Sequence, residues 1–410
     1  MKTVYLLLTT LLFSGLLTTN VYAAKKSIEI NFYSAILNFE YDVAMEEIHL
    51  DKEVSEEAFE KFDFDLNNTS YYTILGKLFY YKEKLELNDW LYYLLIKHCS
   101  EEMFQDKTEA YRTLFCWFLL NKTGYKAQLN YLNEEIILSV FTKDIVYDIP
   151  VREYDDGYFV DITSYEKPTD YRAQKYKKVN YGVAVFHTCK ITNEHGREFS
   201  FKMDKLPKLG TSEIITRELA FIHENELYTV DVDVNLIIIQ LMHNYPELTI
   251  EDHAAIPLSD EANNSLLKQL KSYIDGKSKY EAVRFLLSFT RQAMKYKTDQ
   301  QGYGISNLTF CAEETLYYNF SDCEDRSILF NYLVSQLLDI DVLLLDYPEH
   351  ATTAVALEKV CGNPIEFEGK NYTICDPTGP GNHLQPGEYP LGLDPKAYTI
   401  LNKDIEKKRL

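Results

Sequence analysis

Three short segments in the last third of the chain carry side chains that together could form a thiol active site. The first, residues 317–326, reads YYNFSDCEDR and places Cys323 directly after Ser321 and Asp322, either of which can cap a helix. A cysteine in the first turn of a helix lies beside unpaired N–H groups and the positive end of the helix dipole, and both favour a thiolate. The backbone N–H of Cys323 could also donate to an oxyanion. Alone, a cysteine in this position is a weak sign of catalysis.

A histidine and an aspartate follow the cysteine at regular intervals. His350 opens a predicted strand after a turn, and Asp376 closes another, with spacings of 350 − 323 = 27 and 376 − 350 = 26 residues. A histidine can take the thiol proton, and a carboxylate beside it can accept the other imidazole N–H and set the tautomer. Each residue alone has an ordinary surface or turn reading. In this order, Cys323, His350 and Asp376 predict a nucleophile, a base and an orienting acid.

This ordered set resembles the transglutaminase-like superfamily, relatives of the papain-type cysteine peptidases. It is most similar to exported transglutaminase-like proteins of Bacteroides-type bacteria, and the likeness covers roughly residues 259–390. The motifs that carry it are SDCEDRS at 321–327, PEH at 348–350, CDPT at 375–378 and, upstream, YKTD at 296–299. The resemblance implies a papain-like fold in which His350 takes the thiol proton, Cys323 attacks a carbonyl, and water or an amine resolves the thioester.

The chain departs from the family pattern in two places. Ser321 stands where relatives often carry a glycine, and Gly379-Pro380-Gly381 stands where they tend to carry an aromatic residue. The first could alter the turn into the helix and the second the acceptor side of the cleft. A side chain before the nucleophile could complete the oxyanion site: Gln292, Tyr303, Tyr317 or Tyr318. Gln292 falls in the middle of a predicted helix, which favours a structural role.

The resemblance implies a hydrolase, a cysteine peptidase or amidase that cleaves peptide or isopeptide bonds in a peptide or protein substrate. Two alternatives remain. The enzyme could transfer the acyl group to an amine and cross-link proteins, or the chain could be a binding or scaffold protein with a vestigial site. The sequence has no calcium loop of the DxDxDG kind and no CxxC pair. We therefore expect no cofactor and no metal.

The elements that must position these residues predict an α+β protein. Residues 251–410 form the transglutaminase-like catalytic domain, with amphipathic helices at 279–297 and 321–338 and strands at 342–346, 351–357 and 371–375. Residues 166–250 are predicted to form a β-rich, sandwich-like domain with strands at 179–187, 198–203, 213–221 and 227–241. Residues 24–165 form an N-terminal α+β domain in which helices precede strands.

The end of the first predicted domain resembles the end of the last. Aligning Arg112 with Arg326 sets an offset of 326 − 112 = 214, which places Glu109 at the position of Cys323 and Ile136 at that of His350. With a one-residue gap, Asp161 corresponds to Asp376. This pattern favours a degenerate transglutaminase-like copy that has lost its nucleophile and base. The alternative is coincidence between two helix–strand units.

The first residues predict export. Lys2, an apolar run at 4–17 and the small-residue pattern ending at Ala23 are typical of a signal peptide spanning 1–23. The apolar run is shorter than a membrane span, so we expect a soluble bacterial protein in the periplasm or outside the cell, with no stable membrane insertion after cleavage. A net charge of −21 argues against nucleic-acid partners. The oligomeric state is not predicted.

Overall fold

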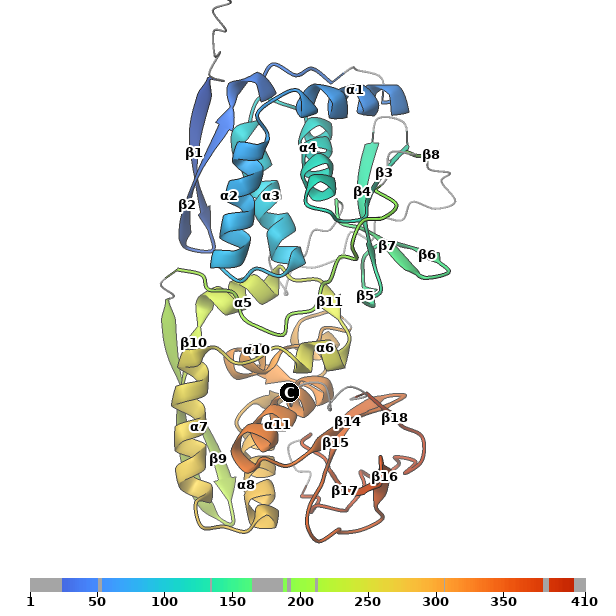
Figure 1. Cartoon of the computed structure of the whole chain (residues 1–410). Helices are drawn as coiled ribbons and strands as arrows, with labels where there is room; N and C mark the ends of the chain where they lie inside the picture. The colour runs from blue at the N-terminus through green and yellow to red at the C-terminus, as the bar shows by residue number, and fades with distance from the viewer. Residues whose placement is uncertain are drawn as a thin grey trace, which may run out of the picture.

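The computed structural model describes residues 24–50, 54–132, 135–163, 187–189, 193–210, 213–305, 307–378 and 383–401. The predicted signal peptide and the Gly379-Pro380-Gly381 segment lie outside the described residues. The chain folds into two lobes, which we define as residues 24–210 and 213–401 (Figure 1). Both lobes contain helices and antiparallel sheets, so the α+β prediction is confirmed. No helix in the described part of the chain is both long and apolar enough to cross a bilayer.

The first lobe begins with a hairpin, continues with a group of helices and ends in a sheet. Its elements are β1 (Lys25–Phe32), β2 (Ala35–Asp42), the 3-10 helix η1 (Val43–Met45), α1 (Glu56–Asn67), α2 (Tyr72–Lys84), α3 (Asp89–Met103), α4 (Glu109–Lys122), β3 (Ala127–Leu132), β4 (Glu135–Thr142), β5 (Val146–Tyr147), β6 (Val151–Tyr154), β7 (Gly157–Asp161) and β8 (His187–Thr188). Helix α2 packs on β2, α3 on β1, and α4 on α3, β3 and β4. The sheet has the order β6-β7-β4-β3-β8.

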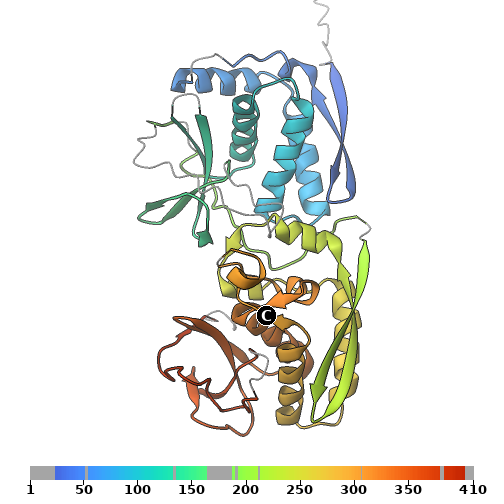
Figure 2. The same ribbon diagram turned by 180° about the vertical axis from the view of Figure 1, so that it is seen from behind.

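The second lobe follows the same plan with extra short elements. Its elements are β9 (Ile214–His223), β10 (Glu226–Asn235), α5 (Leu236–His243), β11 (Glu247–Leu248), α6 (Ile250–Ala254), α7 (Asp260–Ile274), α8 (Lys279–Gln292), β12 (Lys295–Tyr296), α9 (Asp299–Gly302), α10 (Ala312–Tyr317), β13 (Phe320–Ser321), α11 (Cys323–Leu338), β14 (Val342–Tyr347), β15 (His350–Val355), β16 (Ile365–Phe367), β17 (Lys370–Cys375) and β18 (Thr399–Ile400). Seen from behind, the β9–β10 hairpin lies along α7 and α8 (Figure 2).

The two lobes share one topology. Helix α7 packs on β10 and α8 on β9, while α11 packs on α8, β14 and β15. The second sheet has the order β16-β17-β15-β14-β18, which matches the order of the first sheet strand for strand. In both sheets the strand after the central helix pairs with the next strand as a tight hairpin, Leu132 opposite Glu135 in one lobe and Tyr347 opposite His350 in the other. By hairpin register the counterpart of His350 is therefore Glu135, one residue before the predicted Ile136.

The predicted β-rich domain at 166–250 is wrong for its described part. Residues 187–188 form the edge strand β8 of the first sheet, and residues 198–203 form no strand, although Phe199 and Phe201 are buried in the core of the first lobe. The hairpin from Ile214 to Asn235 buries one face against the helices of the second lobe instead. The boundary therefore falls near residue 211, about 40 residues before the predicted one. Most of the predicted strand at 179–187 lies outside the described residues.

The predicted strand at 227–241 ends early, because its last part is helical. Alternating burial at Val230, Val232 and Val234 fits a strand, but the run from Leu236 is helix α5. The side chain of Asn235 accepts the N–H of Ile237 at 3.0 Å and so caps this helix. A short apolar run such as LIII has no periodicity that distinguishes a helix from a strand. The capping residue Asn235 is the local feature that favours the helix.

Candidate functional site

Cys323 is the first residue of α11, as predicted. Asp322 is the N-cap residue with an extended backbone, and its N–H donates to Asp325 Oδ2 at 3.1 Å, which closes the first turn. Helix α11 packs against β15, and its second turn contacts the start of that strand where Ser327 donates to the Ala351 carbonyl. The Cys323 side chain is buried there, with 8% of the residue exposed.

His350 and Asp376 meet in the second sheet. His350 Nε2 lies 3.3 Å from Asp376 Oδ1, an ion-pair distance without an aligned hydrogen bond. The same Asp376 oxygen accepts the Thr378 N–H at 3.2 Å and the Thr378 hydroxyl at 2.7 Å. Burial raises the pKa of the Asp376 carboxyl, but His350 and Thr378 outweigh it, and the pKa lies below its ordinary value. Asp376 is thus an ionised carboxylate beside the imidazole, as its predicted role requires.

The cysteine approaches this pair through the backbone of β15. Its sulfur interacts with the N–H of Ala351, the residue after His350, and Ser327 one turn along α11 donates to the Ala351 carbonyl at 3.2 Å. Among the described residues, the hydrogen bond of the Cys323 thiol goes to Glu324 Oε2 at 2.9 Å rather than to His350. His350 and Asp376 therefore lie together, Cys323 contacts the residue after His350, and the thiol must turn away from Glu324 to reach the imidazole.

The surroundings of Cys323 do not favour a resting thiolate. Burial raises the pKa of the Cys323 thiol, and the Glu324 and Asp322 carboxylates raise it further, while the Ala351 N–H lowers it. A helix terminus contributes only about 0.3–1 kcal/mol in a typical exposed setting. Two acidic neighbours in a buried first turn outweigh that contribution. The expected stabilisation of a thiolate by the helix start is therefore not found, and the sulfur rests as a thiol.

Two buried arginines hold the parts of the site together. Arg326, which has no exposed surface, donates to Ser321 Oγ at 3.0 Å and to the carbonyls of Arg291 and Met294 at 3.1 and 2.6 Å. Arg291 in turn donates to the Asp376 carbonyl at 2.9 Å. Ser321 therefore supplies an acceptor to a buried guanidinium. The turn into α11, the end of α8 and the aspartate form one connected framework.

A set of carboxylates fixes the loop that precedes the nucleophile. The N–H groups of Leu308, Thr309 and Phe310 donate in turn to Asp299 Oδ2 at 2.7 Å, Glu247 Oε1 at 2.9 Å and Asp325 Oδ1 at 2.8 Å. Burial raises the pKa of Asp299 to about 7. Burial, together with the charges of neighbouring carboxylates, raises the pKa of Asp322 to about 11. The floor of the site is thus acidic, buried and partly protonated at neutral pH.

Tyr296 is a site residue that sequence reasoning did not single out as a donor. It lies in β12, which pairs with β13 so that Tyr296 is opposite Ser321. Burial raises its pKa to about 12, and the neighbouring charges of Cys323, Asp322 and Glu324 add to the effect, so Tyr296 belongs to the electrostatic surroundings of the sulfur. The only sequence signal was its membership of the YKTD segment. A two-residue strand that pairs across 25 residues has no periodicity to reveal it.

The four predicted oxyanion candidates have other partners. Gln292 accepts the Ile222 N–H at 3.1 Å and donates to the Ile222 carbonyl at 2.8 Å, which confirms its structural role. The Tyr303 hydroxyl donates to the Phe320 carbonyl at 2.8 Å, and Tyr318 stacks on Phe310 with ring centroids 4.6 Å apart. The Tyr317 carbonyl accepts from Arg217. These contacts engage the Gln292 amide and the Tyr303 hydroxyl with partners other than Cys323, and Tyr296 is a further candidate because its pKa responds to the charge of Cys323.

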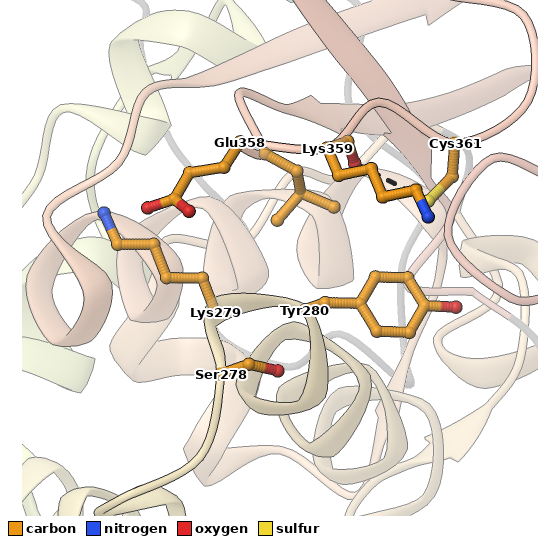
Figure 3. A pocket seen from close by; sticks show the side chains of 7 residues that line it. Ser278, Lys279, Tyr280, Glu358, Lys359 and Cys361 are labelled. Atoms are coloured by element: carbon orange, nitrogen blue, oxygen red, sulfur yellow. Dashed lines mark hydrogen bonds between the residues drawn. The ribbon is translucent and has the colours of Figure 1, made fainter.

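A cavity of about 480 Å³ lies elsewhere in the second lobe. Lys359 and Cys361 face Tyr280 across it, and the remaining lining residues are Ser278, Lys279, Leu357 and Glu358 (Figure 3). It opens at the beginning of α8, whereas Arg291 contacts Asp376 near the end of that helix. Eleven residues of helix separate the two places by about 16 Å. The cavity is therefore not part of the triad site.

Comparison of the chain with protein-family models, with curated proteins and with solved structures gave no match. The site must therefore be interpreted from its own geometry. All seven cysteines are unpaired, so no disulfide constrains Cys323. Within the described residues, one group of possible metal ligands comes together, and it consists of Asp322, Cys323 and Glu324.

Proposed function

We propose that the second lobe is a transglutaminase-like thiol hydrolase domain of an exported protein, a cysteine peptidase or amidase that acts on peptide or isopeptide bonds. The observation that carries the proposal is that the Cys323 sulfur contacts the N–H of Ala351, next to His350, while His350 lies 3.3 Å from Asp376. The spacing in sequence and the resemblance of the surrounding motifs support it. The sequence pattern at residues 1–23 supports export to the periplasm or the medium.

The residues can divide the reaction as follows. His350 Nε2 faces Asp376, which leaves Nδ1 to take the proton from Cys323. The thiolate attacks the substrate carbonyl, and the Cys323 N–H and the Tyr296 hydroxyl stabilise the oxyanion. His350 returns the proton to the leaving amine as the carbon–nitrogen bond breaks and a thioester remains. Water, deprotonated by His350, then hydrolyses the thioester, and Cys323 recovers its proton.

One observation favours a second candidate, a binding protein with a vestigial site. The Cys323 thiol donates to Glu324 and has a raised pKa, so the resting site is not activated. In the enzyme proposal, substrate binding must turn the thiol toward His350. In the binding proposal, it never turns. A third outcome, transfer of the acyl group to an amine, differs from hydrolysis only in which nucleophile reaches the thioester.

Alkylation of Cys323 by iodoacetamide, followed by mass spectrometry across pH, tests the proposal. A thiol that His350 can deprotonate should react well below the pH at which an isolated buried thiol would react. His350→Ala should abolish this early phase. The half-exposed Cys361 provides an internal control in the same digest, because its reactivity should be unchanged. Equal Cys323 profiles in both proteins would refute the enzyme proposal, and amine incorporation into a glutamine-bearing acceptor would replace hydrolysis by transfer.

A further inference from the structure

Three consecutive residues at the start of α11 bring their donor atoms together. A carboxylate oxygen of Asp322, the Cys323 sulfur and a carboxylate oxygen of Glu324 all lie within 4.8 Å of one another. Adjacent residues inside a helix point in different directions, but Asp322 is the N-cap and has an extended backbone, with φ −114° and ψ −150°. The change of backbone direction between Asp322 and Cys323 allows the three side chains to converge.

The group is buried on one side and open on the other. Asp322 and Cys323 are 7% and 8% exposed, whereas Glu324 is half-buried and borders solvent. Asp322 Oδ1 is buried and accepts no hydrogen bond from the residues that the structure describes. A buried carboxylate oxygen without a partner is costly, so it needs either a shared proton or a cation. This orphaned oxygen is an observation independent of the clustering.

No side-chain cation neutralises the group. In the described part of the chain, no lysine or arginine forms an ion pair with Asp322, Cys323 or Glu324. The nearest guanidinium, that of Arg326, donates to Ser321 and to two backbone carbonyls. The Asp299 side chain forms a hydrogen bond with that of Asp322. Among the described residues, no cationic side chain therefore competes for these donor atoms, which lie at the edge of a buried site.

We propose that Asp322, Cys323 and Glu324 bind a thiophilic divalent cation of the zinc type. A thiolate and two carboxylates are donors that Zn²⁺ accepts, and the partly exposed Glu324 side leaves a fourth position for water. On binding, the Cys323 thiol releases its proton to solvent and a sulfur–metal bond forms. The side chain of Asp299, which forms a hydrogen bond with Asp322, would orient this ligand without contacting the metal. The sequence predicted no metal, because ligands at three adjacent positions match no familiar spacing.

The cation and the proposed hydrolysis exclude each other. A sulfur bound to the metal has no free electron pair directed at a carbonyl, and it no longer needs His350 as a base. Only this inhibition rests on the proposed function, whereas the binding itself does not. Bound metal would hold the enzyme inactive until a stronger chelator or a metal-poor medium releases it.

The test uses the mature chain after treatment with a reductant and a chelator. Titration with Co²⁺ should give a near-ultraviolet thiolate-to-cobalt absorption band that saturates at one equivalent, and Zn²⁺ should displace the cobalt. Cys323→Ser should lose the band. Glu324→Gln should keep the fold and weaken Zn²⁺ binding, measured by calorimetry, by about 10-fold or more. Cys361→Ser is the matched control and should keep both the band and the affinity.

Several results would overturn the metal site. They are a wild-type protein without the band, a band that persists in a folded Cys323→Ser protein, and Mg²⁺ binding as tightly as Zn²⁺, which would indicate a general acidic patch. In that case, a proton shared between Asp322 and a neighbouring carboxyl would explain why Asp322 Oδ1 accepts no hydrogen bond from the described residues. The readouts separate the two proposals. If the protein binds cobalt but Cys323 alkylation does not depend on His350, only the enzyme proposal is overturned. If alkylation depends on His350 but no cobalt band appears, only the metal site is overturned.

Discussion

The starts of α4 and α11 occupy the same place in the two lobes, yet they offer different chemistry. In each lobe an arginine near the start of the helix donates to carbonyls at the end of the preceding packed helix. Arg112 reaches the carbonyls of Phe104 and Lys107 at 3.2 and 2.7 Å, and Arg326 reaches those of Arg291 and Met294. The alignment of these two arginines in the sequence therefore corresponds to a shared structural role.

The aspartates show the same correspondence. Asp161 Oδ1 accepts the N–H of Thr163 at 2.9 Å, just as Asp376 Oδ1 accepts that of Thr378 at 3.2 Å. Both are turns closed by an aspartate side chain, at the end of the equivalent strands β7 and β17. At the start of the strand that pairs with this region, the first lobe has Glu135 where the second lobe has His350. The arginine and the aspartate turn are thus parts of the scaffold, and the cysteine and the histidine are what the second lobe adds.

The largest expected difference between the lobes is in thiol chemistry. Cys323→Ala should reduce labelling by peptide electrophiles to background, because the nucleophile is removed. Glu109→Ala, at the equivalent and exposed helix start, should leave labelling unchanged. Gel fluorescence with a panel of electrophilic peptides measures both. Residual labelling of the Cys323→Ala protein at the wild-type level would assign the reactivity to another thiol.

The aspartates should differ next. Asp376→Asn should lower the rate of the acylation step by on the order of 10²–10⁴-fold, because the amide cannot hold the imidazole in the required tautomer. Asp161→Asn should leave that rate unchanged, since no imidazole depends on it. Single-turnover labelling kinetics measure the effect. Equal losses in the two variants would mean that the effect is one of folding rather than of orientation.

The arginines should differ in stability rather than in rate. Arg326→Leu removes donors from two buried carbonyls and from Ser321, and we expect a loss of roughly 3 kcal/mol or more in the free energy of unfolding. Arg112 is only partly buried, so Arg112→Leu should cost about 1–2 kcal/mol. Urea unfolding followed by circular dichroism measures both. A larger loss for Arg112 would contradict the view that the second lobe depends more on its arginine.

The last expected difference is a pH dependence to which Asp299 of the second lobe contributes. The Asp299 pKa is raised by burial to about 7 in the folded state, above the ordinary value of 3.8 that it regains on unfolding. The folded state therefore binds the proton more tightly, so its contribution is fully present below pH about 4 and is lost as pH rises through about 7. The slope is at most about 1.4 kcal/mol per pH unit.

Asp299→Asn should flatten this slope, and thermal unfolding between pH 4 and 8 measures it. Asp161→Asn serves as the first-lobe control and should keep the slope of the wild-type protein. A slope that is unchanged in the Asp299→Asn protein would assign the effect to another buried acid, such as Asp322.

The sequence predicts the central helix and the strands of the second lobe well, because their signals are local. A capping residue, helical periodicity and β-branched runs between turns are enough to locate α11, β14, β15 and β17. The order and spacing of Cys323, His350 and Asp376 depend on these elements, so the places of the three residues at the ends of a helix and two strands were predictable. The two strands of the β9–β10 hairpin were also predicted. The helices that cover this hairpin were not, because only the packing in the folded protein shows which helices they are.

The remaining features depend on contacts between distant segments. The carboxylates around residues 308–310 come from separate elements, and no local pattern joins Glu247 to Thr309 across 62 residues. The same applies to Tyr296 beside Cys323. The direction of the Cys323 pKa shift was misjudged because the dipole of a helix is visible in sequence, whereas the burial that opposes it is not.

Glu247, which accepts a hydrogen bond from the loop before Cys323, also lies in a strand that pairs with the first lobe. It belongs to β11, and β11 pairs with β5 of the first lobe, with Glu247 opposite Tyr147. A chain cut at residue 251 would lose this carboxylate and the β9–β10 hairpin together, and a cut at 213 would leave β11 without its partner strand. If the lobes arose by duplication, loss of the first lobe would also remove the partner strand of β11. The strand pair therefore makes the loop before Cys323 depend on the first lobe through Glu247.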